Sequence, residues 1–396
     1  MGQASAFRVS QLGEASARED VRQARIGFLP KVTAPLDVIY TSPSLGGERP
    51  RPPSFLGANA ITEYQGLINV AGEIDTSGRL KATLLKNQAL LEAARAGTEV
   101  AKRDLLQAVT EAYFNLELSI AKRVGAEASL QTAREFENYT KLNLDAGEVA
   151  PVDLVRARLQ TASRVDEVDQ AITEESVNSY ALKALIGEPI TEQISIEDLM
   201  TQMPVDNEVE RFAEAAISTR AELQQFAAER SAAEQDIRAA QAERRPQLTY
   251  SVSSGFIADS LRPGRIKDQT GIQATVGFTI PIFDWGASRS RETQARLRLQ
   301  QTETSRALAE RQFAQVFYAA RTQALAARER IRRLAASIPD AEANVTASVA
   351  RYRAGEATIT EPVDAQNQLV TMRQALRQAI FDYQTAKAHL ARASGQ

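Results

Sequence analysis

The sequence predicts a mainly α-helical fold, internally duplicated, with two long helical hairpins and four β-strands per chain. Three observations predict this fold class. Long stretches without proline are rich in Ala, Leu, Gln, Glu, Lys and Arg, which favour helices. Four segments alternate apolar and polar residues with a period of two, as half-buried strands do. The same order of elements occurs twice along the chain.

The composition excludes several kinds of site. The 396 residues carry a net charge of -3, which argues against nucleic acid as a partner because phosphate binding needs a basic surface. The chain has no cysteine and one histidine, which excludes thiolate and multi-histidine metal sites. No catalytic constellation or cofactor motif occurs, so we expect no enzyme activity, no metal and no cofactor.

The first structural repeat is predicted over residues 1–190. After an N-terminal helix it contains strands at about 31–41 and 60–74, followed by a helical hairpin over 78–186. A segment with two prolines follows, and we interpret residues 191–208 as a linker between the repeats.

The second structural repeat is predicted over residues 209–396. It begins with a helix from about 210 to 244, continues with strands at about 247–257 and 270–283, and ends with a helical hairpin over 287–394. The duplication is supported by matched segments, since the tripeptide AGE occurs at the same point of both hairpins.

The long helix of the second repeat has coiled-coil periodicity. Apolar residues between Phe313 and Tyr352 recur at spacings of four and three, which averages to the 3.5-residue period of coiled-coil packing. An ordinary helical bundle is the alternative. Pro339 lies inside this run, and we expect it to bend the helix because it removes a backbone hydrogen bond.

The four strands need a partner. In a membrane, an open sheet would leave the N–H and C=O groups of its edge strands unpaired, at a high cost in free energy. Three copies of the chain would supply twelve strands, an even number within the range of outer-membrane barrels.

The N-terminus lacks the apolar run of a secretory signal, because Arg8 and Glu14 interrupt it. Either the protein is cytosolic, or the native signal peptide is missing from this chain.

Two motifs resemble the TolC family of outer-membrane efflux channels. One is the segment VGFTIPIFDWG before a long helix, which resembles the family's strand-to-helix junction; its residues are Pro281, Phe283, Asp284, Trp285 and Gly286, with Gly78 as the counterpart in the first repeat. The other is RYRAG at 351–355 followed by PVDAQ at 362–366, which resembles the helix-turn-helix at the tip of the family's tunnel.

The resemblance implies a fold and a function. It implies a homotrimer with a 12-stranded transmembrane β-barrel and a periplasmic α-barrel, located in the Gram-negative outer membrane and surrounded by outer-membrane lipid. Such a protein is a passive exit duct that docks on a periplasmic adaptor protein and an inner-membrane pump of the RND, ABC or MFS type. The alternative is a cytosolic or periplasmic coiled-coil scaffold or adaptor protein, against which the tandem hairpins and amphipathic strands argue.

The resemblance also implies functional residues at the tunnel tip. The candidate gate consists of Asp153, Tyr352, Glu361 and Asp364. A ring of such carboxylates would attract cations. The alternative for the acids is that they cap the N-termini of the helices. The candidate adaptor contacts are Gly147, Glu148, Pro151, Gly355, Glu356 and Pro362. At the other end, Phe283 and Trp285 would join an aromatic girdle at the membrane interface or pack the strand-to-helix junction.

Overall fold

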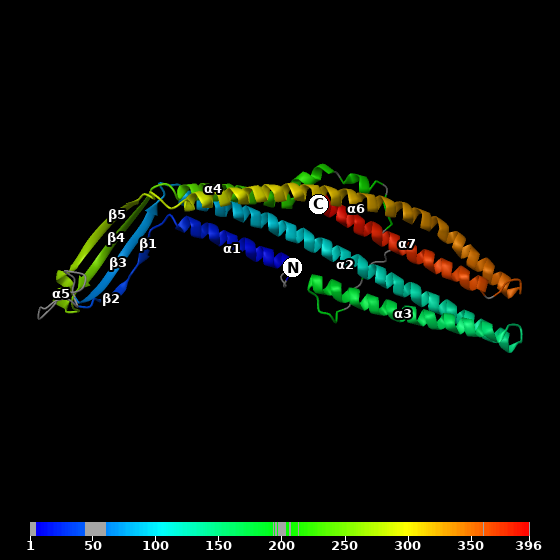
Figure 1. Ribbon diagram of the computed structural model, residues 1–396. Coiled ribbons are helices and arrows are strands. Elements are labelled where there is room, and N and C mark those ends of the chain that lie inside the picture. Colours follow the sequence, from blue (N-terminus) through cyan, green and yellow to red (C-terminus); the bar gives the residue numbers. More distant parts are fainter. Residues whose placement is uncertain are drawn as a thin grey trace. The chain divides into compact units, whose positions relative to one another are not determined.

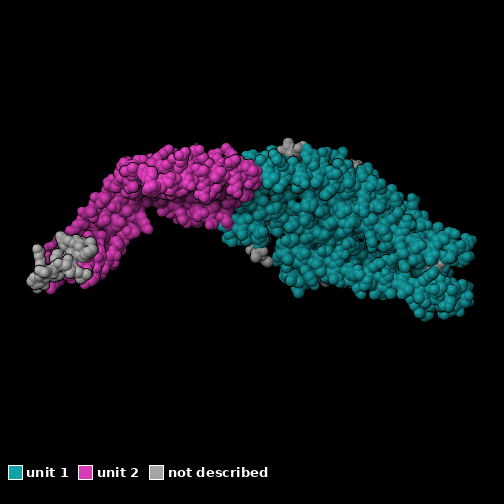
Figure 2. Space-filling view, viewed as in Figure 1, with its two compact units in different colours: residues 1–12, 96–224, 306–396 teal, residues 13–95, 225–305 magenta. Residues whose placement is uncertain are grey.

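The computed structural model describes residues 5–43, 61–192, 194, 196, 203–205, 207–212, 214–358 and 360–395. The chain divides into two compact units, which are coloured separately in Figure 2. Unit 1 comprises residues 1–12, 96–224 and 306–396, and unit 2 comprises residues 13–95 and 225–305. The predicted linker 191–208 and the predicted start of the second strand at residue 60 lie partly outside the described residues.

The structure is mostly helical with a small antiparallel sheet, as predicted. Figure 1 labels its elements in chain order: α1 (Ala6–Ile26), β1 (Lys31–Thr33), β2 (Leu36–Tyr40), β3 (Thr62–Ile74), α2 (Arg79–Asp145), α3 (Pro151–Ile186), η2 (Val209–Arg211), η3 (Glu214–Thr219), α4 (Ala221–Ala242), β4 (Gln247–Ala258), α5 (Pro263–Asp268), β5 (Thr270–Thr279), α6 (Ala287–Arg353) and α7 (Thr360–Ala393). None of the described helices is both long and apolar enough to cross a membrane.

The sheet belongs to unit 2 and has the strand order β1-β3-β4-β5, with β2 also paired to β3. All pairs are antiparallel. Directly opposite residues lie on the same face of a sheet. Because Val70 lies opposite Val252 and Val252 opposite Ala274, the apolar positions of successive strands share one face. The other face is polar, and there Ser253 donates a hydrogen bond to Asn69 over 3.2 Å.

Two prolines change the predicted strands. The strand expected at 31–41 is divided into β1 and β2, because Pro35 between them has no N–H to donate. Its carbonyl still accepts the N–H of Leu67 over 3.1 Å, so both parts remain on the same edge of β3. The strand expected at 270–283 ends at Thr279, two residues before Pro281.

Two helix predictions were wrong in detail. The helix expected from about residue 210 begins at Ala221, and two short 3-10 helices precede it. These irregular turns bring Val209, Phe212 and Ile217 together onto the hydrophobic core of unit 1. A short helix, α5, lies between β4 and β5, where the sequence predicts no helix or strand, and Pro263 occupies its first turn.

The core of unit 1 lies along the hairpins. Figure 1 shows α3 running back beside α2, and α7 beside α6. The predicted apolar seam of α6 is buried, and its members at Phe317, Ala320, Ala324, Ala327 and Ile331 pack with apolar residues of α7. The small alanine side chains let the helices approach closely. Helix α6 continues through Pro339.

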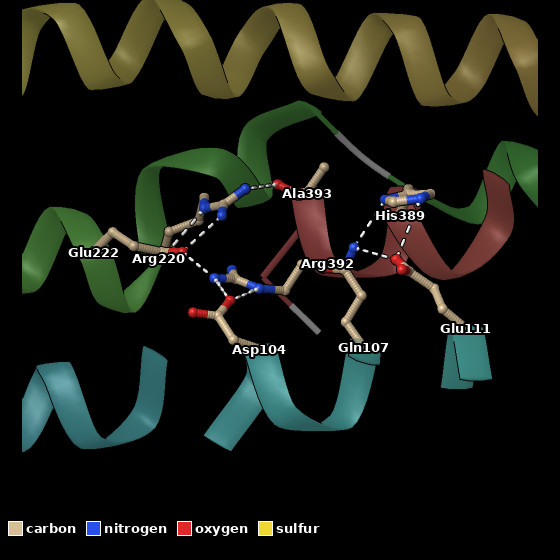
Figure 3. A network of polar contacts seen from close by, with 8 residues as sticks. All are labelled: Asp104, Gln107, Glu111, Arg220, Glu222, His389, Arg392 and Ala393. Carbon is tan, nitrogen blue, oxygen red and sulfur yellow. Dashed lines mark hydrogen bonds and ion pairs between the residues drawn. The ribbon is translucent and has the colours of Figure 1, made fainter. Parts of the chain in front are cut away.

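A polar network anchors the C-terminal end of α7 inside unit 1 (Figure 3). The guanidinium of Arg220 donates two hydrogen bonds to Glu222, of 2.7 and 3.2 Å, and one to the carbonyl of Ala393, of 3.0 Å. The same guanidinium lies 4.0 Å from the centre of the Phe313 ring. This buried cation therefore joins the start of α4 to the last turn of α7.

The network continues to α2. Arg392 pairs with Glu222 and with Asp104, each over 2.6 Å. One turn earlier, His389 lies 2.9 Å from Gln107 and 3.3 Å from Glu111, both on α2. No sequence pattern indicated a role for His389, whereas the structure places it in the contact between α7 and α2.

The charge of Glu222 is stabilised by its partners. Burial alone would raise the pKa of its carboxyl group, but the hydrogen bonds from Arg220 and Arg392 outweigh burial and lower the pKa to about 2. A carboxyl whose pKa is lower in the folded state than in the unfolded state stabilises the fold at pH values above its unfolded pKa. That stabilisation is lost as the pH falls through the folded pKa.

We predict that acid weakens unit 1 through Glu222. The stability of the wild-type protein should fall between about pH 5 and pH 2, and Glu222→Gln should cost about 2 kcal/mol at pH 7 and flatten this part of the pH profile. Thermal unfolding followed by circular dichroism at several pH values measures both effects. Glu329→Gln, which alters an exposed glutamate of α6, is the matched control. An unchanged acid profile in Glu222→Gln would contradict the prediction.

A second prediction concerns the contact between β3 and β4. A Cβ atom at Gly255 would lie 2.0 Å from the carbonyl oxygen of Gly66, and Gly255 has a φ of 151°. Gly255→Ala should therefore destabilise the sheet by about 1–3 kcal/mol or more. Gly264→Ala in α5 meets no atom within 4 Å and is the control. Thermal unfolding measures both, and equal stability of the two variants would contradict the close approach.

Candidate functional site: the hairpin tips and the strand-to-helix junctions

The tip of the first hairpin is a glycine-terminated turn. Helix α2 ends at Asp145, and Gly147 follows with a φ of 78°. The N–H of Glu148 donates to the carbonyl of Asn143 over 2.9 Å, and the N–H of Gly147 donates to Leu144 over the same distance. This pattern satisfies carbonyls that the helix end leaves free. Helix α3 then begins with Pro151 in its first turn.

The tip of the second hairpin repeats this turn. Helix α6 ends at Arg353, and Gly355 follows with a φ of 73°. The N–H of Glu356 donates to the carbonyl of Arg351 over 2.9 Å, which is the same bond that Glu148 makes. After this turn α7 begins at Thr360, and Pro362 is buried in its first turn. The duplicated sequence therefore builds the same local geometry twice.

The three predicted gate acids lie near the starts of α3 and α7: Asp153 and Glu361 are in the first turns, and Asp364 follows directly after the first turn of α7. Among the described residues, the side chains of Asp153 and Asp364 form no ion pair, whereas Glu361 pairs with Arg351 of α6. The residue before α3 is Ala150, which provides no side-chain cap. Asp153 makes no capping hydrogen bond in the described structure, although its charge is favourable near a helix N-terminus.

The fourth gate residue, Tyr352, lies in an aromatic cluster. Its ring centre is 5.7 Å from that of Phe136 and 6.1 Å from that of Tyr139, both on α2. Burial raises the pKa of the Tyr352 hydroxyl. Tyr352 therefore packs one hairpin against the other within the chain. Phe136 and Tyr139 were not predicted, although their spacing of three on a helix was a usable signal for a shared face.

A groove lies between residues 156–163 of α3 and the start of α7. Its volume is about 360 Å³, and its walls include Arg156, Leu159, Thr360 and Asp364. Asp364 is exposed, and so are Gly147, Glu148, Pro151, Gly355 and Glu356 on the turns. Of the predicted tip contacts, only Pro362 is buried. The tips thus present two matching turns with exposed acidic groups.

The junction of β5 with α6 is held by Asp284. Its carboxylate accepts the backbone N–H groups of Gly286 and Ser288, over 3.1 and 2.7 Å, and the hydroxyl of Ser288. These hydrogen bonds, led by the Ser288 hydroxyl, lower the pKa of Asp284. The cap fixes the intervening Trp285 and Gly286 at φ values of 56° and 85°. A left-handed conformation is uncommon for a tryptophan, so we infer that the hydrogen bonds of the Asp284 cap hold the Trp285 backbone in it.

The aromatic residues at this junction point away from the protein. Phe283 is 73% and Trp285 91% exposed, and their rings contact each other edge to face at 4.8 Å. Pro281 is also exposed. They do not pack the strand-to-helix junction as buried residues would.

The first repeat has a similar junction between β3 and α2. Gly78 has a φ of 83°, and the carboxylate of Asp75 accepts the N–H groups of Leu80 and Lys81 over 3.0 and 2.8 Å. The capping role of Asp75 was not predicted. The sequence signal was present, since Asp75 precedes Gly78 much as Asp284 precedes Gly286.

Among the described residues, no group of three or more His, Cys, Asp or Glu side chains is arranged to hold a metal ion. The chemistry that the two sites offer is therefore charge at the hairpin tips and apolar surface at the junctions.

The chain is similar in fold to solved outer-membrane channels. It matches the outer membrane protein VceC of Vibrio cholerae with a TM-score of 0.85 and 20% identity, covering 99% of this chain and 93% of VceC. It matches the MtrE outer membrane channel of Neisseria gonorrhoeae with a TM-score of 0.83 and 21% identity, covering 98% of this chain and 85% of MtrE. It matches the CmeC outer membrane channel of Campylobacter jejuni with a TM-score of 0.85 and 15% identity, covering 98% of this chain and 82% of CmeC. The comparison with curated protein sequences gives no significant match.

The family model described as outer membrane efflux protein matches residues 2–188 and 213–396, which is nearly the whole chain. This is a family of channels rather than enzymes, and its members serve tripartite efflux systems. The match confirms the predicted exit duct and gives no support to the alternative of a coiled-coil scaffold or adaptor. The chain belongs to the outer membrane efflux protein family and is an efflux channel of the outer membrane that extends into the periplasm.

Proposed function

We propose that three copies of this chain form a homotrimeric duct whose sheets close into a single 12-stranded β-barrel. The observation that carries the proposal is the pair of unpaired sheet edges. Among the described strands, β5 at one edge and β1 with β2 at the other have no neighbour on their outer side. Alternation along the order makes β5 antiparallel to the β1 of a following copy, so closure would continue the pattern without a break.

The faces of the sheet fit this arrangement. Leu36, Val38, Ile272, Val276 and Phe278 are exposed on the apolar face, where outer-membrane lipid would cover them. The opposite face, with Asn69 and Ser253, would line a water-filled lumen. The exposed rings of Phe283 and Trp285 would then lie at the membrane interface as part of an aromatic girdle.

The proposal divides the chain into two structural repeats, 1–190 and 209–396, joined by the linker 191–208. Each repeat would contribute one hairpin to the periplasmic α-barrel. Helix α3 supports this role, because Val152, Val155 and Leu159 are more than half exposed along one side of its first turns. A neighbouring copy or a partner would cover these side chains.

We propose that the hairpin tips are both the gate and the docking site for a periplasmic adaptor protein. The adaptor would contact the exposed turns at Gly147, Glu148, Pro151, Gly355 and Glu356, while the buried Pro362 would fix the start of α7. The adaptor would connect the duct to an inner-membrane pump of the RND, ABC or MFS type, which supplies the energy. No nucleic acid takes part.

The gate would act by charge. Threefold symmetry would bring together three copies of each tip, with the unpaired carboxylates of Asp153 and Asp364 near a constriction and Tyr352 holding the two hairpins together. The charge of Glu361 is offset by Arg351, so its contribution would be smaller. Such a ring would bind multivalent cations, and the bound cations would block the duct.

Single-channel conductance in a planar bilayer tests the proposal. We expect a steady conductance that a trivalent cation blocks from the tip side. Asp153→Asn with Asp364→Asn should raise the half-blocking concentration by about tenfold or more, and Glu361→Gln should have a smaller effect. The amide variants keep their side-chain shape, so a change reports charge rather than misfolding.

Glu329→Gln with Asp340→Asn removes equal charge from α6 away from the tip and serves as the control. Block that is unchanged in the tip variant would contradict the acidic gate and leave these acids as favourable charges at helix N-termini. Protein that never inserts or conducts would contradict the duct.

A further inference from the structure

The end of the sheet that meets the helices carries an unusual concentration of positive charge. Four chain segments meet there, because Lys31 in β1, Ile74 in β3, Gln247 in β4 and Thr279 in β5 all lie at this end in the strand register. All belong to unit 2. The basic residues on these segments, named here the cationic belt, are Arg22, Arg25, Lys31, Arg79, Lys81, Arg244, Arg245, Arg289 and Arg291.

Most acidic residues on the same segments are occupied. The carboxylates of Asp75 and Asp284 accept the N–H groups at the starts of α2 and α6. Glu243 pairs with Arg291 over 3.1 Å. Glu73 and Glu292 pair with Arg79 and Arg244, and these five acids are all buried or partly buried. The exposed acids on these segments, Glu19 and Asp20 of α1, are outnumbered by the belt, of which every member except Arg79 is exposed. The surface at this end is therefore positive, in a chain whose net charge is -3.

Helix stabilisation explains only part of the belt. Cations at a helix C-terminus are favourable, which accounts for Arg25 at the end of α1. Cations at a helix N-terminus oppose the helix dipole. Yet neither α2 nor α6 has an acidic residue in its first turn, and Lys81 and Arg289 occupy the third positions of these helices.

Four members of the belt lack a protein partner. Among the described residues, the side chains of Arg25, Lys31, Lys81 and Arg289 form no hydrogen bond and no ion pair, although all four are exposed. The other five members have partners in the chain: Arg22 pairs with Glu19, Arg79 with Glu73, Arg244 with Glu292 and Arg291 with Glu243, and Arg245 donates a hydrogen bond to the Ser77 carbonyl. The unpartnered four are therefore available to an external anion.

Exposed apolar side chains lie beside these cations. Leu29 precedes β1, and Ile282 and Trp285 follow β5, with Ile282 93% exposed. An apolar band next to a row of unpaired cations is the pattern of a surface at a membrane interface, where chains meet phosphate headgroups. A surface facing only water would not need such large exposed apolar groups beside its charges.

We propose that the cationic belt binds the phosphate headgroups of anionic phospholipids in the membrane leaflet that surrounds this end of the sheet. The inference rests on the proposed insertion of the sheet in a membrane. It adds that this end of the sheet selects anionic lipids. Arg25, Lys31, Lys81 and Arg289 would contact the phosphates, and Leu29, Ile282, Phe283 and Trp285 would enter the boundary between headgroups and acyl chains.

Trp285 makes the proposal measurable. It is the only tryptophan in the chain, so the tryptophan fluorescence of the protein comes from a residue beside the cationic belt. The protein is reconstituted in bilayers of phosphatidylcholine and phosphatidylglycerol in which only one of the two lipids carries brominated chains. Bromine quenches tryptophan on contact. At equal mole fractions, the ratio of the two quenching efficiencies reports which lipid is enriched around Trp285.

We expect brominated phosphatidylglycerol to quench about threefold more than brominated phosphatidylcholine, since each cation near the surface attracts anionic lipid. High salt should reduce the difference. The variant Arg25→Gln, Lys31→Gln, Lys81→Gln and Arg289→Gln should quench equally with both lipids. The control variant Arg134→Gln, Arg238→Gln, Arg298→Gln and Arg311→Gln removes the same charge from exposed helix positions outside the belt and should behave as wild type.

The failures are distinguishable. Equal quenching by both lipids in the wild-type protein would overturn the lipid preference and leave the membrane-inserted duct intact. If the preference for phosphatidylglycerol persists in the belt variant, other residues cause it, and the proposed role of the cationic belt is overturned. Absence of quenching by either lipid would place Trp285 outside the bilayer and overturn the proposed insertion together with this inference. Steady conductance of the belt variant confirms that it has folded.

Discussion

The pairing of backbone groups at the edges of the sheet is the constraint on which the rest of the structure depends. Strands β3, β4 and β5 present a continuous apolar face, and in the described part of the chain the outermost strands have N–H and C=O groups without partners on their outer sides. Such an edge is unfavourable in water, where it invites aggregation, and costs far more in lipid. In the proposed homotrimer, the strands of neighbouring copies complete these edges. The proposal also gives the duplicated hairpins a role, because each copy would supply its strands and helices at regular angular intervals around the duct.

Duplication gives each half the same local devices, with chemistry adjusted at each end. At both junctions an aspartate accepts hydrogen bonds from N–H groups in the first turn of the long helix. At both tips a glycine with positive φ ends that helix. Among the described residues, an aromatic pair at the junction and an ion pair between the two helices at the tip turn, Arg351–Glu361, are found in the second repeat. The repeated turns therefore present the same candidate contacts twice, and the parts that differ distinguish the two hairpins. Between the two ends, Arg220 and Arg392 join three helices of unit 1 through Glu222, Asp104 and the end of α7.

Much of the fold could be predicted because it depends on local signals. The seam residues of α6 followed from their 3.5-residue period, and the apolar face of β4 followed from its alternation. The start of α4 could not be predicted, because the 3-10 turns before it are selected by the core that receives Val209 and Phe212, a tertiary effect. Pro35 and Pro281 were visible in the sequence, yet where strand pairing stops beside them depended on the partner strands. At the site, the tip residues were found by resemblance, whereas the partners of Tyr352 and the capping by Asp75 required the folded structure.

The most direct test of the account is whether the two sheet edges meet between copies. The chain has no cysteine, so introduced pairs have no background. A scan would place one cysteine in β5 and one in β2, at successive registers, in protein folded in its membrane. The account predicts that at least one register yields covalent dimers and trimers on a non-reducing gel. The pair Asn69→Cys with Ser253→Cys, whose residues face each other across β3 and β4, should yield only cross-linked monomer. Only monomers at every register, with this control pair cross-linked, would contradict closure of the barrel by neighbouring copies.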